Sequence, residues 1–453
     1  MFPLCITPDR TGRALLFPAH LRRTITRPTV LLCGKPCSLM PTRAQAPAVP
    51  RLTYLRIKNY RALRDVEFRD LTPLTVLIGP NGSGKSTVLD ALDFLAEAVG
   101  GNLKDACDKR NRFAGMRTRG SEGSISFEIV ISGFPYLGQL KYILELEEGD
   151  KEKILVKEWL AVKDDSTEEL LLTTEPARKE GWTDFISSLN TEQSDDDKIE
   201  KPVKISISSS SQVMLGYAFA VNSKLSIYAH AVIDTLKSYR YIHLTDDHLK
   251  GYSDAGPREK LSPNGDNLPN VLYYLHTKHP ETLAKITAQM RRWVPSLADI
   301  VPEITSDERI LLRFKDAEFE KPLPAQYMSD GTMRLAALLT LLYEPDAAGL
   351  LGIEEPENEL HPQLLAGLAE ELIDAAERRQ LLVATHSPAL LNALAPEQVW
   401  ILHRGADGYT QATRVADLPG IPAMVEEGSP LGYLWSRNFF DVGNPLDLPV
   451  PIK

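Results

Sequence analysis

Apolar residues recur along the chain with two different periods, and the change of period separates strands from helices. Alternation with period two marks residues 125–131 and 140–146, and another apolar run covers 154–162. Segments of this kind, separated by breaks that contain glycine, predict an antiparallel sheet. Shorter strand-like runs lie at 52–57, 65–68 and 310–314.

Short runs that are apolar throughout alternate with segments of helical spacing elsewhere in the chain. The run at 75–78 enters a glycine-rich loop, and helical spacing follows over 86–98. The runs at 349–353 and 381–384 lie among further helical segments at 332–343, 362–378 and 388–394. Strands that alternate with helices predict a parallel α/β sheet.

The middle of the chain has a different character. Residues 164–211 are polar, whereas 224–242 and 267–294 have helical spacing without a sustained heptad repeat. We therefore expect an inserted helical lobe and no long coiled coil. The predicted organisation is an N-terminal half at 51–165, a polar insert and helical lobe at 166–300, a C-terminal half at 301–440 and a tail at 441–453.

Residues 1–50 carry seven Lys and Arg residues against one acid, with no sustained periodicity. An Arg-rich, acid-poor start is typical of a transit peptide. The alternative, which we favour, is a poorly ordered extension translated from a start codon assigned too early.

Composition narrows the class of protein. Hydrophobic residues make up 43% of the 453 residues and charged residues 25%, as in ordinary globular proteins. The net charge of −10 argues against nucleic-acid coating by bulk charge, so any such contact must be a local patch. Apolar runs are too short to span a membrane, and four Cys residues are too few for a disulfide scaffold, which predicts a reduced, cytoplasmic protein.

A phosphate-binding loop of the form GxxxxGK[ST] lies between the apolar run at 75–78 and the helix that follows. Its residues are Gly79, Pro80, Asn81, Gly82, Ser83, Gly84, Lys85, Ser86 and Thr87. Glycines let several backbone N–H groups point at one phosphate chain, and the start of the helix adds its positive end. The pattern predicts that Lys85 binds the β/γ-phosphates and that Ser86 is a ligand of Mg²⁺.

Polar side chains follow two other apolar strands, where ligands gather in open α/β sheets. Glu354 and Glu355 end the run at 349–353, and His386 follows the run at 381–384. We expect Glu354 to hold Mg²⁺, Glu355 to orient or deprotonate the attacking water, and His386 to bond a γ-phosphate. Two adjacent buried acids repel each other unless a cation lies between them.

Ser329 and Gly331 open the helix that precedes the acid pair. Backbone N–H groups at such a start form an anion site, although Ser alone is also an ordinary helix cap.

These motifs, in this order, resemble the ABC-type ATPases. Residues 55–61 (LRIKNYR) and 354–362 (EEPENELHP) are similar to the RecF-like predicted ATPases, relatives of RecF, SMC and OLD proteins often placed among AAA ATPases of the ABC class. Residues 264–268 and 432–435 also look like that group, so the resemblance covers about 51–440. It implies an ABC-type fold, with a parallel sheet plus an antiparallel β subdomain, and ATP hydrolysis with Mg²⁺.

The family further implies a homodimer with ATP between the protomers. The loop 79–87 of one protomer would face Ser329 and Gly331 of the other, with residues 358–361 crossing the interface. Two features depart from the family pattern: Gln139, in a strand-like run, is a doubtful Q-loop residue, and His361 occupies the usual D-loop Asp position.

The resemblance leaves the pathway open between DNA repair and antiphage defence. OLD relatives carry a C-terminal TOPRIM nuclease, which we do not expect here because only 25 residues follow Gly428 and no Asp-x-Asp occurs. The basic run at 109–119 predicts either a DNA contact or a solvated loop. Two alternatives stay open: a nucleotide-binding scaffold that signals to an effector encoded nearby, and, disfavoured by the helical lobe, a transporter ATPase subunit.

Overall fold

The computed structural model describes residues 49–149, 153–163, 168–176, 183–187, 203–207, 213, 215–220, 223–251, 253–254, 256 and 258–444. All of them belong to one compact unit, 47–453. The predicted N-terminal extension lies outside the described residues except for Val49 and Pro50. The predicted division of the chain into domains stays a prediction.

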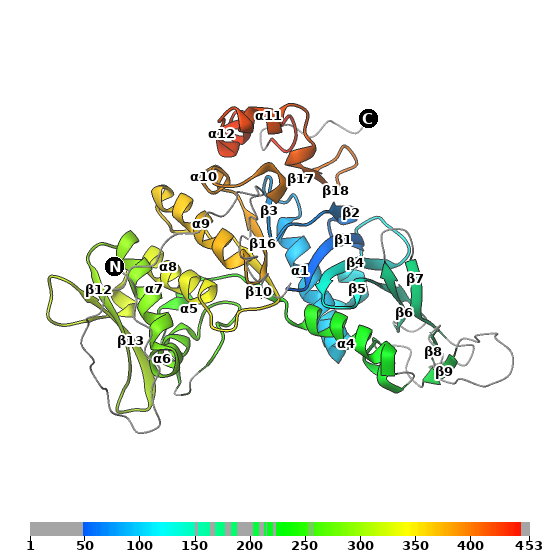
Figure 1. Ribbon diagram of the computed structural model, residues 1–453, viewed down its shortest axis with the longest axis horizontal. Helices are drawn as coiled ribbons and strands as arrows, with labels where there is room; N and C mark the ends of the chain where they lie inside the picture. The colour runs from blue at the N-terminus through cyan, green and yellow to red at the C-terminus, as the bar shows by residue number, and fades with distance from the viewer. Residues whose placement is uncertain are drawn as a thin grey trace, which may run out of the picture. The chain divides into compact units, whose positions relative to one another are not determined.

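An eight-stranded antiparallel sheet contains the strands with period two (Figure 1). Its order is β2 (Leu63–Arg69), β1 (Arg51–Tyr60), β4 (Ile125–Phe134), β5 (Gly138–Glu148), β6 (Ile154–Lys163), β7 (Glu168–Pro176), β8 (Thr183–Ser187) and β9 (Val203–Ile207). Strands β7 to β9 arise from the segment expected to be a polar insert, so that segment extends the sheet.

A six-stranded sheet forms the centre of the fold. Its order is β10 (Arg240–Ile242), β15 (Leu350–Glu354), β16 (Gln380–Thr385), β3 (Leu74–Ile78), β17 (Val399–Arg404) and β18 (Thr410–Arg414). All neighbouring strands are parallel except β17 and β18. Glu354 lies opposite Ala384, and Thr385 lies opposite Ile78, so three strand ends meet at one edge.

Residues of this central sheet belong to two hydrophobic cores. Leu77 faces the core that contains α1 (Lys85–Glu97), α4 (Ser223–Lys237) and the antiparallel sheet. Its neighbours Val76 and Ile78 face the core that contains α8 (Asp330–Leu342) and α9 (Leu365–Ala376). Burial on both faces explains why these strands are apolar throughout.

The predicted helix at 224–242 is too long. Helix α4 ends at Lys237, and residues 240–242 form β10 at the edge of the central sheet. Ile242 and Leu244 are buried while His243 is exposed, which is the alternation of a strand. A strand of three residues is too short to interrupt a helical pattern visibly.

The predicted helix at 267–294 is two helices, α6 (Leu268–Lys278) and α7 (Pro280–Trp293). His279 between them has φ −135° and ψ 58°, because the residue before a proline is driven out of the helical region. These helices pack on a third sheet, which was foreseen only at 310–314. Its strands are β11 (Ser253–Asp254), β13 (Arg309–Asp316), β12 (Leu297–Ile304) and β14 (Leu323–Pro324).

Shorter helices complete the fold. They are α2 (Leu103–Asp108), α3 (Arg112–Met116), α5 (Asp246–Leu249), α10 (Pro388–Leu391), α11 (Ile421–Glu426) and α12 (Leu431–Ser436). Among the helices of the described residues, none has the length and apolarity needed to cross a membrane.

Candidate functional site

The phosphate-binding loop connects β3 to α1, as predicted, with the helix starting at Lys85. Gly84, at the helix N-cap, has φ 103°, and a Cβ there would lie 2.6 Å from Thr410 Oγ1. The turn therefore requires glycine. Lys85 Nζ donates to the carbonyl oxygens of Gly79 at 2.9 Å and Pro80 at 3.2 Å, which holds the ammonium group inside the loop.

Lys85 is only 5% exposed. Burial lowers the pKa of Lys85 to about 8, although Glu355, Glu354 and Glu357 oppose the shift by favouring the charged form. Lys85 is thus the cation expected beside the acid pair. Three carboxylates and one buried ammonium group therefore interact electrostatically at this end of the sheet.

Glu354 and Ser86 meet directly, with the Ser86 hydroxyl donating to Glu354 Oε1. A carboxylate and a hydroxyl are oxygen donors of the kind that Mg²⁺ prefers. Among the described residues, no three His, Cys, Asp or Glu side chains gather into a metal cluster. This donor set fits Mg²⁺, which usually keeps one or two protein ligands and takes the rest from phosphate and water.

Glu355 points away from Glu354. Its φ of 45° is left-handed, and its N–H donates to Ala384 O at 2.8 Å. Asn358 Nδ2 donates to Glu355 Oε2 at 2.7 Å, and His386 Nε2 lies 3.5 Å from Glu355 Oε1. The carboxylate therefore faces the end of the neighbouring strand β16, next to His386, which is predicted to bond the γ-phosphate.

The loop that carries His386 is held by Glu357. Glu357 Oε1 accepts hydrogen bonds from Thr385 Oγ1 at 2.6 Å and from His386 N at 2.8 Å. Burial, followed by the charge of Lys85, lowers the pKa of His386 from its usual value of 6.5, although Glu355 partly offsets the shift. This environment therefore favours the neutral imidazole.

A cavity of about 420 Å³ opens beside these groups. It is lined by Ile78, Gly79, Pro80, Asn81, His386 and Trp435. Trp435 belongs to α12, which lies against α10 so closely that a Cβ on Gly432 would be 1.8 Å from Pro388 O. The C-terminal motif at 432–435 thus borders the first half of the phosphate-binding loop.

Ser329 and Gly331 are not among the residues that line this cavity. Ser329 is the exposed N-cap of α8, and its Oγ accepts from Thr332 N at 3.2 Å. A Cβ on Gly331 would lie 2.4 Å from Glu359 O, so the segment after the acid pair packs against the start of α8. Within one chain these two residues remain separate from the loop 79–87, whose predicted partner is a second protomer.

Three residues at the site were missed by the sequence analysis. Tyr241 and His243, on and just after β10, contact Glu354, and Glu357 bonds the His386 loop. Burial and the hydrogen bond to Glu354 raise the pKa of the Tyr241 phenol well above its usual value. The alternation over 240–244 was the available signal for β10.

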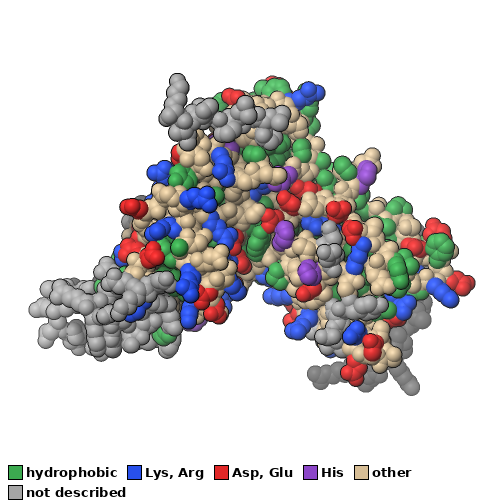
Figure 2. Space-filling view, turned by 180° about the vertical axis from the view of Figure 1, so that it is seen from behind, with side chains coloured by type: hydrophobic (Ala, Val, Ile, Leu, Met, Phe, Trp, Pro, Cys, Tyr) green, Lys and Arg blue, Asp and Glu red, His purple; other side chains and the backbone are tan. Residues whose placement is uncertain are grey.

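The predicted basic run at 109–119 is largely neutralised. Arg110 is buried and bonds Asp90, Asp93 and Glu97, while Lys109 also pairs with Glu97. Arg112 and Arg117 pair with Asp108 and Glu148. On the face seen in Figure 2, basic and acidic side chains are interspersed. Of these bases only Arg110 is buried, and whether the run contacts DNA stays a prediction.

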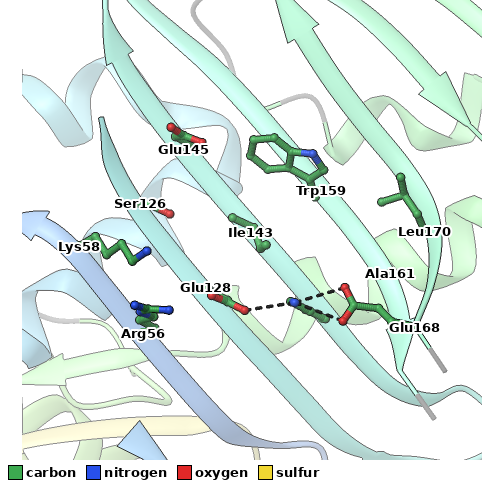
Figure 3. Close-up of a pocket in the computed structure, with 11 residues that line it drawn as sticks. Arg56, Lys58, Ser126, Glu128, Ile143, Glu145, Trp159, Ala161, Glu168 and Leu170 are labelled. Carbon is green, nitrogen blue, oxygen red and sulfur yellow. Dashed lines mark hydrogen bonds and ion pairs between the residues drawn. The ribbon is translucent and has the colours of Figure 1, made fainter. Parts of the chain in front are cut away.

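A second concavity of about 300 Å³ lies on the outer face of the eight-stranded sheet (Figure 3). Trp159, Ile143 and Leu170 lie along it, and Lys141 pairs with Glu128 and Glu168 at 3.2 Å each. Its lining holds three bases and three acids, so this surface lacks the excess positive charge that a phosphate chain requires.

Comparison with solved structures finds similarity to SMC head domains. The SMC head bound to the C-winged helix domain of ScpA is 12% identical, with a TM-score of 0.50 over 80% of this chain and 97% of that one. An SMC head domain with an extended coiled coil, bound to a ScpA domain derived from Pyrococcus furiosus, is 11% identical over 83% of this chain and 100% of that one, with a TM-score of 0.43. The first likeness establishes the fold.

Sequence comparison adds a relative and a family. The OLD nuclease of Thermus scotoductus is 43% identical over 53 residues, which is 12% of this chain and 10% of that protein. The family described as "AAA domain, putative AbiEii toxin, Type IV TA system" matches residues 74–392, well over half of the chain. The protein therefore belongs to this family of AAA ATPase domains and has the fold of an SMC-head, ABC-type P-loop ATPase.

Proposed function

We propose that the protein hydrolyses ATP with Mg²⁺ and dimerises around the nucleotide as a switch in DNA repair or genome defence. One observation carries the proposal: Lys85, Ser86, Glu354, Glu355 and His386 meet at the ends of the adjacent strands β3, β16 and β15. Phosphoryl transfer needs positioning and charge stabilisation more than covalent chemistry, and these side chains supply both.

Each side chain has a distinct role. Lys85 binds the β/γ-phosphates, exchanging the carbonyl oxygens of Gly79 and Pro80 for phosphate oxygens. Ser86 and Glu354 hold Mg²⁺, which neutralises charge on the phosphate chain when bound. Glu355, fixed by Asn358, orients the attacking water and accepts its proton, while His386 donates a hydrogen bond to the γ-phosphate.

The dimer places the exposed start of α8, with Ser329 and Gly331, over the loop 79–87 of the second protomer. Support comes from the exposure of Ser329 and from the packing of the Glu359 backbone beside Gly331. The backbone N–H groups at this helix start then face the γ-phosphate.

The pathway rests on the comparisons. A short match to an OLD nuclease and a family described by an AbiEii toxin favour genome defence in the cytoplasm, with an effector protein as partner. The SMC head of the solved structure binds a domain of another protein, ScpA, which is a precedent for such a partner. Direct DNA contact has less support, because four bases of the run at 109–119 are ion-paired.

The test uses Glu355→Gln, which keeps the size of the side chain but removes the base. We expect ATP to bind, remain uncleaved and hold a dimer of about twice 50.4 kDa in light scattering with Mg²⁺. Glu370→Gln, a change at an exposed acid of α9 outside both the site and the proposed interface, is the matched control and should hydrolyse ATP normally. Adding Ser329→Arg to Glu355→Gln should return the protein to a monomer that still binds ATP.

Two outcomes contradict the proposal. Hydrolysis by Glu355→Gln at the wild-type rate excludes Glu355 as the base. A wild-type protein that binds ATP tightly without measurable turnover favours the nucleotide-binding scaffold that signals to an effector.

A further inference from the structure

The edge strand β10 brings two additional side chains to the predicted metal ligand. The Tyr241 hydroxyl donates to Glu354 Oε2, and His243 Nδ1 lies 3.2 Å from the same oxygen. Both residues are far from Glu354 in sequence. They reach it because Tyr241 is paired with Gly352, two residues before Glu354, in the parallel ladder of β10 and β15.

The two oxygens of Glu354 therefore have different partners. Oε1 accepts from the Ser86 hydroxyl, and Oε2 faces Tyr241 and His243. The Glu354 side chain is 12% exposed, so it has little water to replace these contacts. The carboxylate is consequently held with Oε1 toward the phosphate-binding loop.

We propose that Tyr241 and His243 are positioning residues that orient Glu354 for Mg²⁺, an inference that rests on the function proposed above. Groups that bond the far side of a ligating carboxylate fix its orientation before the metal arrives, and their loss typically weakens metal binding by about 10–100-fold. Among the described residues, neither Tyr241 nor His243 has a hydrogen bond or ion pair to the phosphate-binding loop 79–87. Their loss should therefore leave the binding of metal-free ATP unaffected.

The experiment measures metal binding directly. Mn²⁺ is titrated into the full-length protein with a non-hydrolysable ATP analogue, and bound metal is followed by electron paramagnetic resonance. We expect Tyr241→Phe and His243→Ala each to raise the dissociation constant of Mn²⁺ by about 10-fold. Calorimetry in EDTA should show unchanged affinity for the metal-free nucleotide.

Two further variants separate positioning from a general structural effect. Tyr239 directly precedes β10, and its hydroxyl donates to Leu89 O of α1 at 3.0 Å rather than to Glu354. Tyr239→Phe should therefore leave Mn²⁺ binding unchanged. His243→Asn keeps a hydrogen-bond donor and should recover most of the loss. Because the His243 side chain is 53% exposed, its replacement does not threaten folding.

The outcomes distinguish this inference from the proposed function. Wild-type Mn²⁺ affinity in both Tyr241→Phe and His243→Ala overturns the inference while the wild-type titration still shows a nucleotide-dependent metal site. If the wild-type protein binds neither ATP nor Mn²⁺ with the analogue, the proposed function fails first. An equal loss in Tyr239→Phe indicates a merely structural effect and also overturns the positioning role.

Discussion

ATP binding should take up a proton at alkaline pH, because Lys85 is poised between its two charge states. Burial lowers the pKa of Lys85 to about 8 in the nucleotide-free protein. A bound triphosphate favours the ammonium form strongly and returns the pKa toward its ordinary value near 10.5. The nucleotide complex therefore holds a proton that the free protein has partly lost.

The size of the effect follows from the free-state pKa. With half of the Lys85 groups neutral at pH 8, binding should take up about 0.5 proton there, about 0.9 at pH 9 and about 0.1 at pH 7. Because the nucleotide binds the protonated form of Lys85, the affinity for ATP falls as the pH rises above 8. The fall approaches about tenfold per pH unit until the pKa of the complex is reached.

Calorimetry in buffers of different ionisation enthalpy measures this uptake, because the observed heat varies linearly with the number of protons transferred. Lys85→Arg keeps a positive charge that cannot be lost, so it should bind ATP without proton uptake. His386→Asn should retain the uptake, since the lowered pKa of His386 leaves that ring neutral at pH 8. Equal uptake in Lys85→Arg and wild type, or none in wild type at pH 9, would refute the assignment of this proton to Lys85.

Three other substitutions test the packing around the site. Gly331→Ala places a Cβ 2.4 Å from Glu359 O, so thermal melting should show that the protein is destabilised by about 1–3 kcal/mol. Light scattering should also show loss of the ATP-dependent dimer, and an unchanged dimer would contradict the close packing. Arg110→Met leaves three carboxylates without their shared partner and should lower the free energy of unfolding in urea by about 3–5 kcal/mol. An unchanged free energy of unfolding would show that these ion pairs do not stabilise the fold. Glu357→Ala removes the acceptor of Thr385 Oγ1 and His386 N, which costs about 1–3 kcal/mol of stability for each unsatisfied group. It should reduce the turnover of ATP more than the affinity for ATP. A change in affinity alone would argue against a role of Glu357 in positioning His386.

The sequence was sufficient for the features that depend on strand ends. Residues after consecutive apolar strands converge because parallel strands end at one edge, so Lys85, Glu354 and His386 needed no knowledge of register to be grouped. The antiparallel sheet followed from period two, because its inner face packs on α1 while its outer face carries mostly charged and polar side chains.

Features that depend on pairing between distant segments could not be predicted from the sequence. Strand β10 has three residues, and its place beside β15 comes from tertiary pairing that overrides the helical spacing around it. Within the basic run at 109–119, the burial of Arg110 was not predicted, because its acidic partners lie on α1. A signal existed in retrospect: Asp90, Asp93 and Glu97 are spaced to share one face of α1, which is the face that Arg110 covers.

Glu354 and Glu355 are adjacent in sequence, yet their carboxylates have different partners, as their two proposed roles require. The left-handed conformation of Glu355, which costs about 1–2 kcal/mol for a residue with a side chain, turns its carboxylate toward Asn358 while Glu354 stays with Ser86. Arg334 offsets part of that cost, because its Nη2 donates to Glu355 O at 2.8 Å and its Nη1 to Leu244 O at 3.2 Å. Since Arg334 is buried one helical turn after the exposed start of α8, a shift of α8 on dimerisation would be transmitted to the backbone of the proposed base. The strained conformation of Glu355 thus separates its carboxylate from that of Glu354. Through Arg334, the backbone of Glu355 is also connected to α8, whose start is the predicted dimer surface.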